Sequence, residues 1–409
     1  MSASPTPSPT PSPTPATYRI ATDSIITTFA GGGTVGATTD ADPYGIGDGG
    51  APAAANAARP GNVVVAPDGS VYFTESGTGR ANPLPLVREV SGGVIRTFAG
   101  GGTSLATDSP VPPRQAGKLS SAIAITPGGD LIVRDSRGPA TNGAIQAIAG
   151  ATGNRYGKAL VAGSLVALYI PTAAPSPIPG HLAAAPGGDL YVSDATSKVV
   201  WKLDQTGAFS VVAGNGATAT ATGSAAGDGG PAASASLGSV SRLSVDPGGN
   251  LFLSETGNPT RVRMLCLQSG THFGIEMVAG NLYPVAGRGT FNAAGAADVG
   301  DLGHASNLAG DALEATFRNH TAIAFDPAGN AFVLDTGNAR IRRIDRKTRV
   351  ITTVAGRGVT TSTSAPLGDG GPAGQATFNN PVGLAFLPDG RLLVADDVNN
   401  RVRVIGPVP

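Results

Sequence analysis

Six acidic residues recur at one position of a repeated pattern. Each stands eight residues after the proline of a Pro-x-Gly turn: Glu75, Asp135, Asp194, Glu255, Asp335 and Asp396. A repeat that brought these carboxylates into a ring could bind a cation or a basic peptide. A carboxylate at the end of a strand also stabilises a turn by accepting backbone N–H groups. The spacing therefore predicts a ligand-binding ring or a device that builds each repeat.

Two of the four histidines stand shortly before a turn proline. His181 precedes Pro186 by five residues and His320 precedes Pro327 by seven. A neutral imidazole is a common zinc ligand, so both are weak metal candidates if the repeats surround a central channel. His272 and His304 fall elsewhere in the pattern, which leaves a third histidine ligand missing. The alternative is that both are ordinary residues at strand ends.

An Asp also recurs in a Gly-rich segment. Residues 227–232 and 368–373 read GDGGPA and residues 47–52 read GDGGAP, which places Asp48, Asp228 and Asp369 at equivalent points. We expect the following Pro and Ala residues to form a short helix, with the Asp accepting N–H groups at its start. The alternative is a Ca²⁺ site, although the surrounding sequence has no EF-hand ladder of oxygen ligands.

The turn spacing predicts the elements that must position these residues. The turn prolines lie 60, 59, 61, 80 and 61 residues apart, at Pro67, Pro127, Pro186, Pro247, Pro327 and Pro388. An apolar strand precedes and follows each turn, with apolar residues on consecutive positions, which indicates burial on both faces. A third strand and a fourth, ending in Ala-Gly, complete each unit. Four strands repeated in this way predict the blades of a β-propeller.

The chain ends predict closure of the ring. After the last third strand, to residue 405, too little chain remains for an outer strand, whereas residues 25–31 form an isolated fourth strand. Residues 25–31 read IITTFAG and residues 351–356 read ITTVAG. The sequence thus predicts an all-β, closed six-bladed propeller over residues 18–409, with the N-terminal strand completing the last blade. Closure removes the free sheet edges.

The connections predict two unequal faces. Those from an outer strand to the next inner strand are about 17 to 35 residues long, and they make what we call the loop face. The opposite face, which we call the turn face, should hold tight turns alone. Outer strands should end at the Ala-Gly pairs of 98–100, 161–163, 212–214, 278–280 and 354–356, and 281–314 should be an extra loop. Binding usually resides on long loops carried by a rigid scaffold.

The first residues differ in kind from the rest. Residues 2–15 read SASPTPSPTPSPTP, and alternating Pro excludes helix and sheet, so 1–17 should be a disordered or polyproline-II linker. The tract is similar to the Ser/Thr-Pro stalks of hydroxyproline-rich wall glycoproteins of plants and green algae. This resemblance implies an extracellular, cell-surface or wall location, although no signal peptide is visible. Asn319 opens an Asn-His-Thr sequon and is a candidate for glycosylation.

Composition excludes several classes of function. With 28 basic and 28 acidic residues the net charge is zero, which argues against a general nucleic-acid binder. The single Cys266 excludes an intramolecular disulfide and a cysteine-based zinc site. No apolar run is long enough to span a bilayer. Strand-spaced arginines should be solvated or paired within a blade: Arg261, Arg263, Arg342 and Arg403.

The repeats resemble a known family. The segments FNNPVGLAF (378–386), LLVAD (392–396) and NRVRV (400–404), and the GDGGPA loops, are similar to NHL repeats. The resemblance implies a six-bladed propeller, whereas functions in this family range from protein and RNA binding to catalysis. The peptide-amidating lyases of the group imply a His-ligated zinc, of which His181 and His320 would be two ligands. Calcium lactonase propellers are a further analogy.

These observations favour a non-enzymatic interaction module. The long loops would contact a protein or a glycan, and the module would be displayed on the Pro-rich stalk. No cofactor is expected, with Ca²⁺ or Zn²⁺ left open. The alternative is a metal-dependent lyase or lactonase-like enzyme with its site at the channel mouth.

Overall fold

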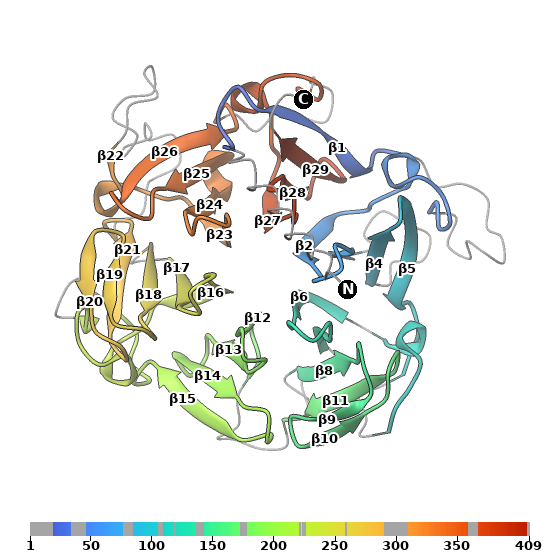
Figure 1. Ribbon diagram of the computed structural model, residues 1–409, viewed down its shortest axis with the longest axis horizontal. Helices are drawn as coiled ribbons and strands as arrows, with labels where there is room; N and C mark the ends of the chain where they lie inside the picture. The colour runs from blue at the N-terminus through green and yellow to red at the C-terminus, as the bar shows by residue number, and fades with distance from the viewer. Residues whose placement is uncertain are drawn as a thin grey trace, which may run out of the picture.

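The structure is a computed structural model that describes residues 19–33, 46–76, 85–104, 109–117, 119–135, 143–171, 178–220, 222, 226–257, 260–289, 310–358 and 367–406. Six small antiparallel sheets stand around a central axis, and Figure 1 shows them as blades of a ring. The prediction of a six-bladed propeller is confirmed. The 1–17 linker and His304 lie outside the described residues.

The blades share one strand order, from the channel outward. Blade 1 holds β2 (Pro60–Val65), β3 (Val71–Glu75), β4 (Leu86–Ser91) and β5 (Val94–Gly100). Blade 2 holds β6 (Leu119–Ile125), β7 (Leu131–Asp135), β8 (Ala144–Ile148) and β11 (Leu165–Tyr169). Blade 3 holds β12 (Leu182–Ala184), β13 (Leu190–Asp194), β14 (Val199–Leu203) and β15 (Phe209–Ala213).

The other three blades follow the same plan. Blade 4 holds β16 (Ser239–Val245), β17 (Leu251–Thr256), β18 (Arg261–Leu265) and β21 (Leu282–Ala286). Blade 5 holds β23 (His320–Phe325), β24 (Ala331–Asp335), β25 (Arg340–Ile344) and β26 (Val350–Ala355), with the short β22 (Gly310–Asp311) outermost. Blade 6 holds β27 (Pro381–Phe386), β28 (Leu392–Asp396), β29 (Arg401–Gly406) and β1 (Ile25–Gly31).

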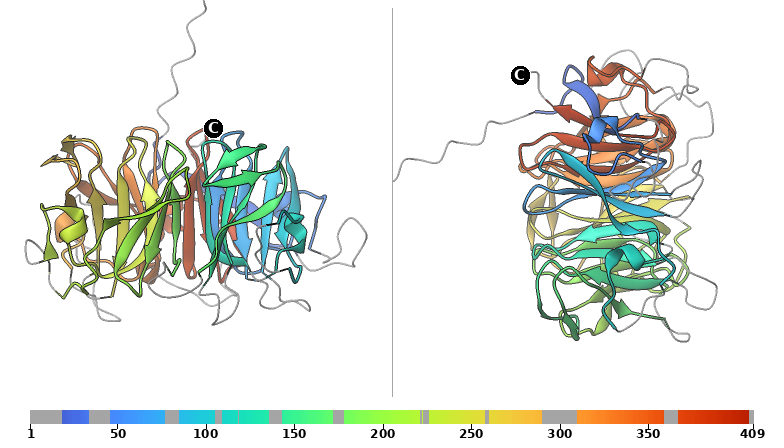
Figure 2. Two further views of the ribbon diagram at one scale, coloured as in Figure 1. Left: turned by 90° about the horizontal axis from the view of Figure 1, so that it is seen from below. Right: turned by 90° about the vertical axis from the view of Figure 1, so that its right-hand side faces the viewer.

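The first strand of the chain closes the ring, as predicted. β1 pairs antiparallel with β29, and Ile25 lies opposite Gly406. Both described chain ends therefore meet in blade 6. Since β29 runs from the loop face to the turn face, the chain leaves the ring on the turn-face side, where Figure 2 shows the C-terminus.

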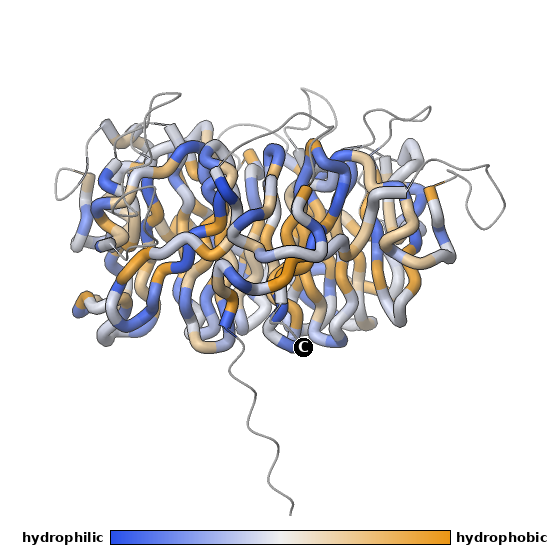
Figure 3. The backbone as a smooth tube through the Cα atoms, turned by 90° about the horizontal axis from the view of Figure 1, so that it is seen from above, coloured by the Kyte–Doolittle hydropathy of each residue, from blue (hydrophilic) through white to orange (hydrophobic). Residues whose placement is uncertain are grey.

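Apolar side chains fill the space between blades. Phe332 of blade 5 meets Phe386 of blade 6 with ring centroids 4.9 Å apart, and both lie in the core shared by these blades. Figure 3, an edge-on view, shows many hydrophobic residues along the strands of the blades. The apolar runs are consecutive rather than alternating because each sheet packs against a neighbour on both sides.

Two blades carry an unpredicted hairpin before their outer strand. β9 (Gly153–Arg155) and β10 (Lys158–Leu160) lie between β8 and β11, and β19 (Gly270–His272) and β20 (Ile275–Met277) lie between β18 and β21. The Ala-Gly pairs of 161–163 and 278–280 follow these hairpins in turns. The prediction that these pairs end outer strands was wrong. An apolar residue followed by Ala-Gly also occurs directly after a hairpin, where it looks the same in the sequence as the end of an outer strand.

The extra loop predicted over 281–314 is likewise corrected. Residues 282–286 form β21, the outer strand of blade 4, and 310–314 contain β22 and a 3-10 turn, Ala312–Glu314. The residues between, 290–309, lie outside the described part.

The hairpin of blade 2 contacts the neighbouring blade. The Tyr156 hydroxyl donates a hydrogen bond to the carbonyl of Gly188 in the Pro-x-Gly turn of blade 3. The turn face is thus more than a set of tight turns.

Candidate functional site

The six predicted acids are buried inside their own blades. Each is at most 3% exposed and closes the second strand. The carboxylates of Asp335 and Asp396 accept N–H groups from Arg318 and Asn379, which stand just before the inner strand, at 2.8 Å in both cases. Glu255 does the same for Gly238 at 3.1 Å. The acid therefore ties the end of the second strand to the start of the first, and its binding of a ligand stays a prediction.

Buried arginines of the third strands are the other partners of these acids. Arg263 of β18 lies 3.3 Å from Glu255, and Arg403 of β29 lies 3.5 Å from Asp396. Arg88 of β4 lies 3.2 Å from Glu75. The prediction of pairing within a blade is confirmed for Arg263 and Arg403, for Arg261 with Glu255 at 2.6 Å, and for Arg342 with Asp335 at 3.6 Å. Burial raises the pKa of Asp396 to about 6, against the opposing effect of the Asn379 N–H and of Arg403.

The Asp of each GDGG segment completes these ion pairs. Asp48 meets Arg88 at 2.7 Å, Asp228 meets Arg263 at 2.6 Å, and Asp369 meets Arg403 at 2.7 Å. The expected short helices exist as 3-10 turns at Pro52–Ala54, Ala232–Ser234 and Ala373–Gln375, and their N-cap residues are Ala or Pro, which offer no side-chain cap. The capping role predicted for the Asp residues was wrong, because a buried guanidinium is the stronger partner.

The two candidate histidines point to different places. His320 is fully buried, packs on the Phe317 ring, and has its Nε2 3.1 Å from the carbonyl oxygen of Arg261 in blade 4. It lies between blades 4 and 5, and burial lowers its pKa to about 4. His181 lies at the channel, with its Nδ1 3.2 Å from Arg242. In the described part of the chain, no three His, Cys, Asp or Glu side chains gather as a metal site.

A polar bridge crosses the channel near its loop-face end. Arg242 of β16 donates from Nε to the carbonyl of Thr321 at 2.7 Å and from a terminal nitrogen to the carbonyl of Val382 at 3.1 Å. With His181, its partners come from blades 3, 5 and 6. We call Arg242, His181, Thr321 and Val382 the neck.

Bulges in the inner strands build this neck. The register with the second strand shifts at the start of five inner strands, for example between Val240 and Arg242 and between Pro381 and Gly383. A bulge turns an extra side chain or carbonyl toward the axis. Sequence reasoning missed Arg242. The signal that could have found it is a single charged residue within the inner strand SVSRLSV.

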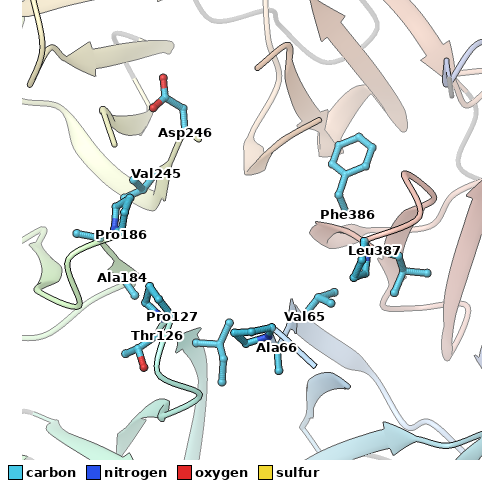
Figure 4. Close-up of a pocket in the computed structure, with 14 residues that line it drawn as sticks. Val65, Ala66, Thr126, Pro127, Ala184, Pro186, Val245, Asp246, Phe386 and Leu387 are labelled. Atoms are coloured by element: carbon cyan, nitrogen blue, oxygen red, sulfur yellow. The ribbon is translucent and has the colours of Figure 1, made fainter. Parts of the chain in front are cut away.

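Beyond the neck the channel is lined mainly by apolar side chains, with Asn62, Ser244 and Asp246 among them. A cavity of about 400 Å³ is lined by all six inner strands, including Val64, Ile125, Ala184 and Leu243. It continues to an opening on the turn face, where Figure 4 shows Pro127, Pro186 and Leu387 around the rim. The channel can therefore hold an apolar group, with the polar groups of the neck at one end.

Asn319 is exposed and stands directly before β23, with a positive φ of 50°. The glycosylation prediction therefore concerns an accessible side chain. Within the described residues, no helix has the length and apolar character needed to cross a membrane.

Comparisons with known proteins agree with this geometry. Residues 287–406 match the Teneurin NHL domain family. The human NHL repeat-containing protein 2 is 29% identical over 168 residues, which are 41% of this chain and 20% of that protein. The chain thus matches about a fifth of that relative's length.

Solved structures share the architecture. An auxiliary nutrient binding protein from Bacteroides ovatus superposes with a TM-score of 0.59 at 15% identity, covering 95% of this chain and 77% of the other. A protein of unknown function from Bacteroides thetaiotaomicron gives a TM-score of 0.58 at 16% identity, covering 93% and 75%. At such identities the likeness concerns the fold alone. The ring of six blades, the family match and the human relative together support a six-bladed β-propeller that is similar to NHL domains.

Proposed function

We propose that this NHL propeller is a non-enzymatic binding module whose loop face contacts a protein. An NHL propeller supports an interaction module, and the finer assignment rests on how the loops are held. The Ser/Thr-Pro segment would display the module at a cell surface or wall. The alternative partner within this proposal is a glycan, which the loop face would bind in place of a protein.

The observation that carries the proposal is the set of ion pairs between GDGG segments and the buried arginines of third strands. Asp48, Asp228 and Asp369 lie on connections that lead to the loop face, and each pairs with an arginine that is fully buried. The parts of these connections that lead into blades 1, 4 and 6 are therefore held at fixed points without any ligand. Preorganised loops lose less entropy on binding.

The position of the chain ends also fits a displayed module. β1 begins opposite Gly406, where the chain leaves on the turn-face side. A stalk attached there would leave the loop face free.

Site-specific photocrosslinking tests the proposal. A photoreactive residue would replace Ala195 or Asn319, both exposed on the loop face, in the full chain added to an extract of the producing organism. Matched controls would carry it at Lys347 or Asp389, exposed in turns of the opposite face. We expect one protein to crosslink at both loop-face positions and to bind the purified chain directly. Equal crosslinking from the two faces, or none from the loop face, would refute the proposal.

Elemental analysis separates this proposal from the metal-dependent alternative. About one tightly held Zn²⁺ or Ca²⁺ per chain would favour a lyase or lactonase-like enzyme at the channel mouth. In that case, replacing His181 and His320 together by Ala should remove a zinc ion. Metal retained after this replacement would exclude these two histidines as its ligands.

A further inference from the structure

The guanidinium of Arg242, a partly exposed residue, differs from the fully buried guanidinium groups of the propeller. Arg88, Arg263 and Arg403 each lie between two carboxylates. Arg242 instead contacts two carbonyl oxygens and an imidazole nitrogen, all uncharged. Burial alone lowers its pKa to about 10, with no acid to offset the loss of water. Its charge therefore lacks a counterion among the described residues.

A second arginine approaches the same place. Arg134 of β7 lies close enough to His181 that both arginines lower the pKa of this imidazole. The Nε of Arg134 is buried and has no hydrogen-bond partner among the described residues. Burial lowers the pKa of Arg134, and the neighbouring Asp135 carboxylate acts in the opposite sense. Arg134 is thus a second cationic group near the imidazole of the neck.

The hydrogen bonds of Arg242 leave its charge without an opposite charge, because all three partners are neutral groups. Removing a charge from water without an opposite charge is costly. A ligand that supplies the negative charge would offset this cost.

We propose that the neck is an anion site that binds the carboxylate group of a small ligand, held by Arg242 and Arg134. A guanidinium has five N–H donors, and Arg242 uses three on Thr321, Val382 and His181. The two that remain are one on each terminal nitrogen, which suits the two oxygens of a carboxylate. This site does not depend on a protein partner at the loop face.

Fluorine NMR with trifluoroacetate as the probe tests the site directly. We expect saturable broadening of the probe signal by the full-length chain, reversed by acetate. Arg242→Gln should weaken binding by about tenfold or more, because a charge-assisted pair is lost. Arg134→Gln removes no hydrogen bond to the described residues and should keep the fold. It should weaken binding severalfold. Arg346→Gln, at an exposed arginine of the turn face, is the matched control and should change nothing.

Competing ligands identify the source of the carboxylate. Hexanoate that displaces the probe better than acetate would place an apolar tail in the 400 Å³ cavity. Triglycine that does so, while triglycinamide does not, would indicate the end of a peptide. Acetate as the best competitor would indicate a small free anion. No saturable probe binding, or binding that is unchanged in both Arg242→Gln and Arg134→Gln, would overturn the proposal.

Discussion

Arg263 and Asp228 form a buried ion pair at 2.6 Å that joins the third strand of blade 4 to the connection preceding its first strand. The same relationship recurs in blades 1 and 6 with Arg88 and Arg403. A residue pair that lies 35 positions apart in the sequence thus fixes the outer part of a blade.

Breaking this pair should destabilise the fold. Asp228→Ala leaves Arg263 with one carboxylate and should lower the free energy of unfolding by about 3 kcal/mol, as for other buried pairs that lose a partner. Urea unfolding measures the change. Asp389→Ala, in an exposed pair with Arg391, is the control and should cost less than about 1 kcal/mol. Equal effects of the two substitutions would contradict a structural role for the GDGG pair.

The hairpin of blade 2 should act as a contact between blades. Gly157 has a φ of 69°, and a Cβ atom there would lie 2.6 Å from the carbonyl oxygen of Thr206 in blade 3. Gly163 has a φ of 73° but no atom within 4 Å of such a Cβ. Gly163→Ala should therefore cost only the left-handed backbone strain, about 1 kcal/mol. Gly157→Ala should lower the free energy of unfolding clearly more in the same urea experiment. Equal losses for the two substitutions would show that the hairpin does not contact blade 3.

Acid should weaken the fold through His320. Its pKa is about 4 in the folded chain and about 6.5 when unfolded, so between these values only the unfolded chain binds the proton. The free energy of unfolding should therefore fall as the pH drops from about 6.5 to about 4, by up to roughly 3 kcal/mol.

A histidine substitution isolates this contribution. Unfolding curves at pH 7, 6 and 5 should show a smaller loss of stability for His320→Gln than for the parent chain. His272→Gln, on the hairpin of blade 4, is the matched control and should follow the parent chain. A His320→Gln curve parallel to the parent would show that this residue does not carry the effect.

Removal of β1 should open the ring. Deleting residues 1–31 exposes the edge of β29, and unpaired strand edges favour association. Size-exclusion chromatography with light scattering should show larger species for this variant. Deleting only residues 1–18 leaves β1 intact and should preserve the behaviour of the full chain. Identical profiles for the two deletions would mean that β1 is dispensable.

The repeat period and the duplicated strand sequence were enough to predict the ring. Turn prolines about 60 residues apart set the blade count, and the match of residues 25–31 to 351–356 predicted the closure. The outer strands of blades 2 and 4 were misplaced because an apolar residue followed by Ala-Gly occurs twice in each, at 148–150 and 161–163 and at 278–280 and 285–287. Local sequence does not distinguish a strand end from a hairpin turn.

By itself, the sequence determined the fold class and the blade order. These follow from short-range patterns repeated along the chain. Only the tertiary structure decided that Asp228 pairs with Arg263 rather than capping a helix, that His320 is enclosed between blades, and that Arg242 reaches His181, Thr321 and Val382. The last contact joins residues up to 140 positions apart. Such a meeting depends on closure of the ring around its axis, and no local pattern records it.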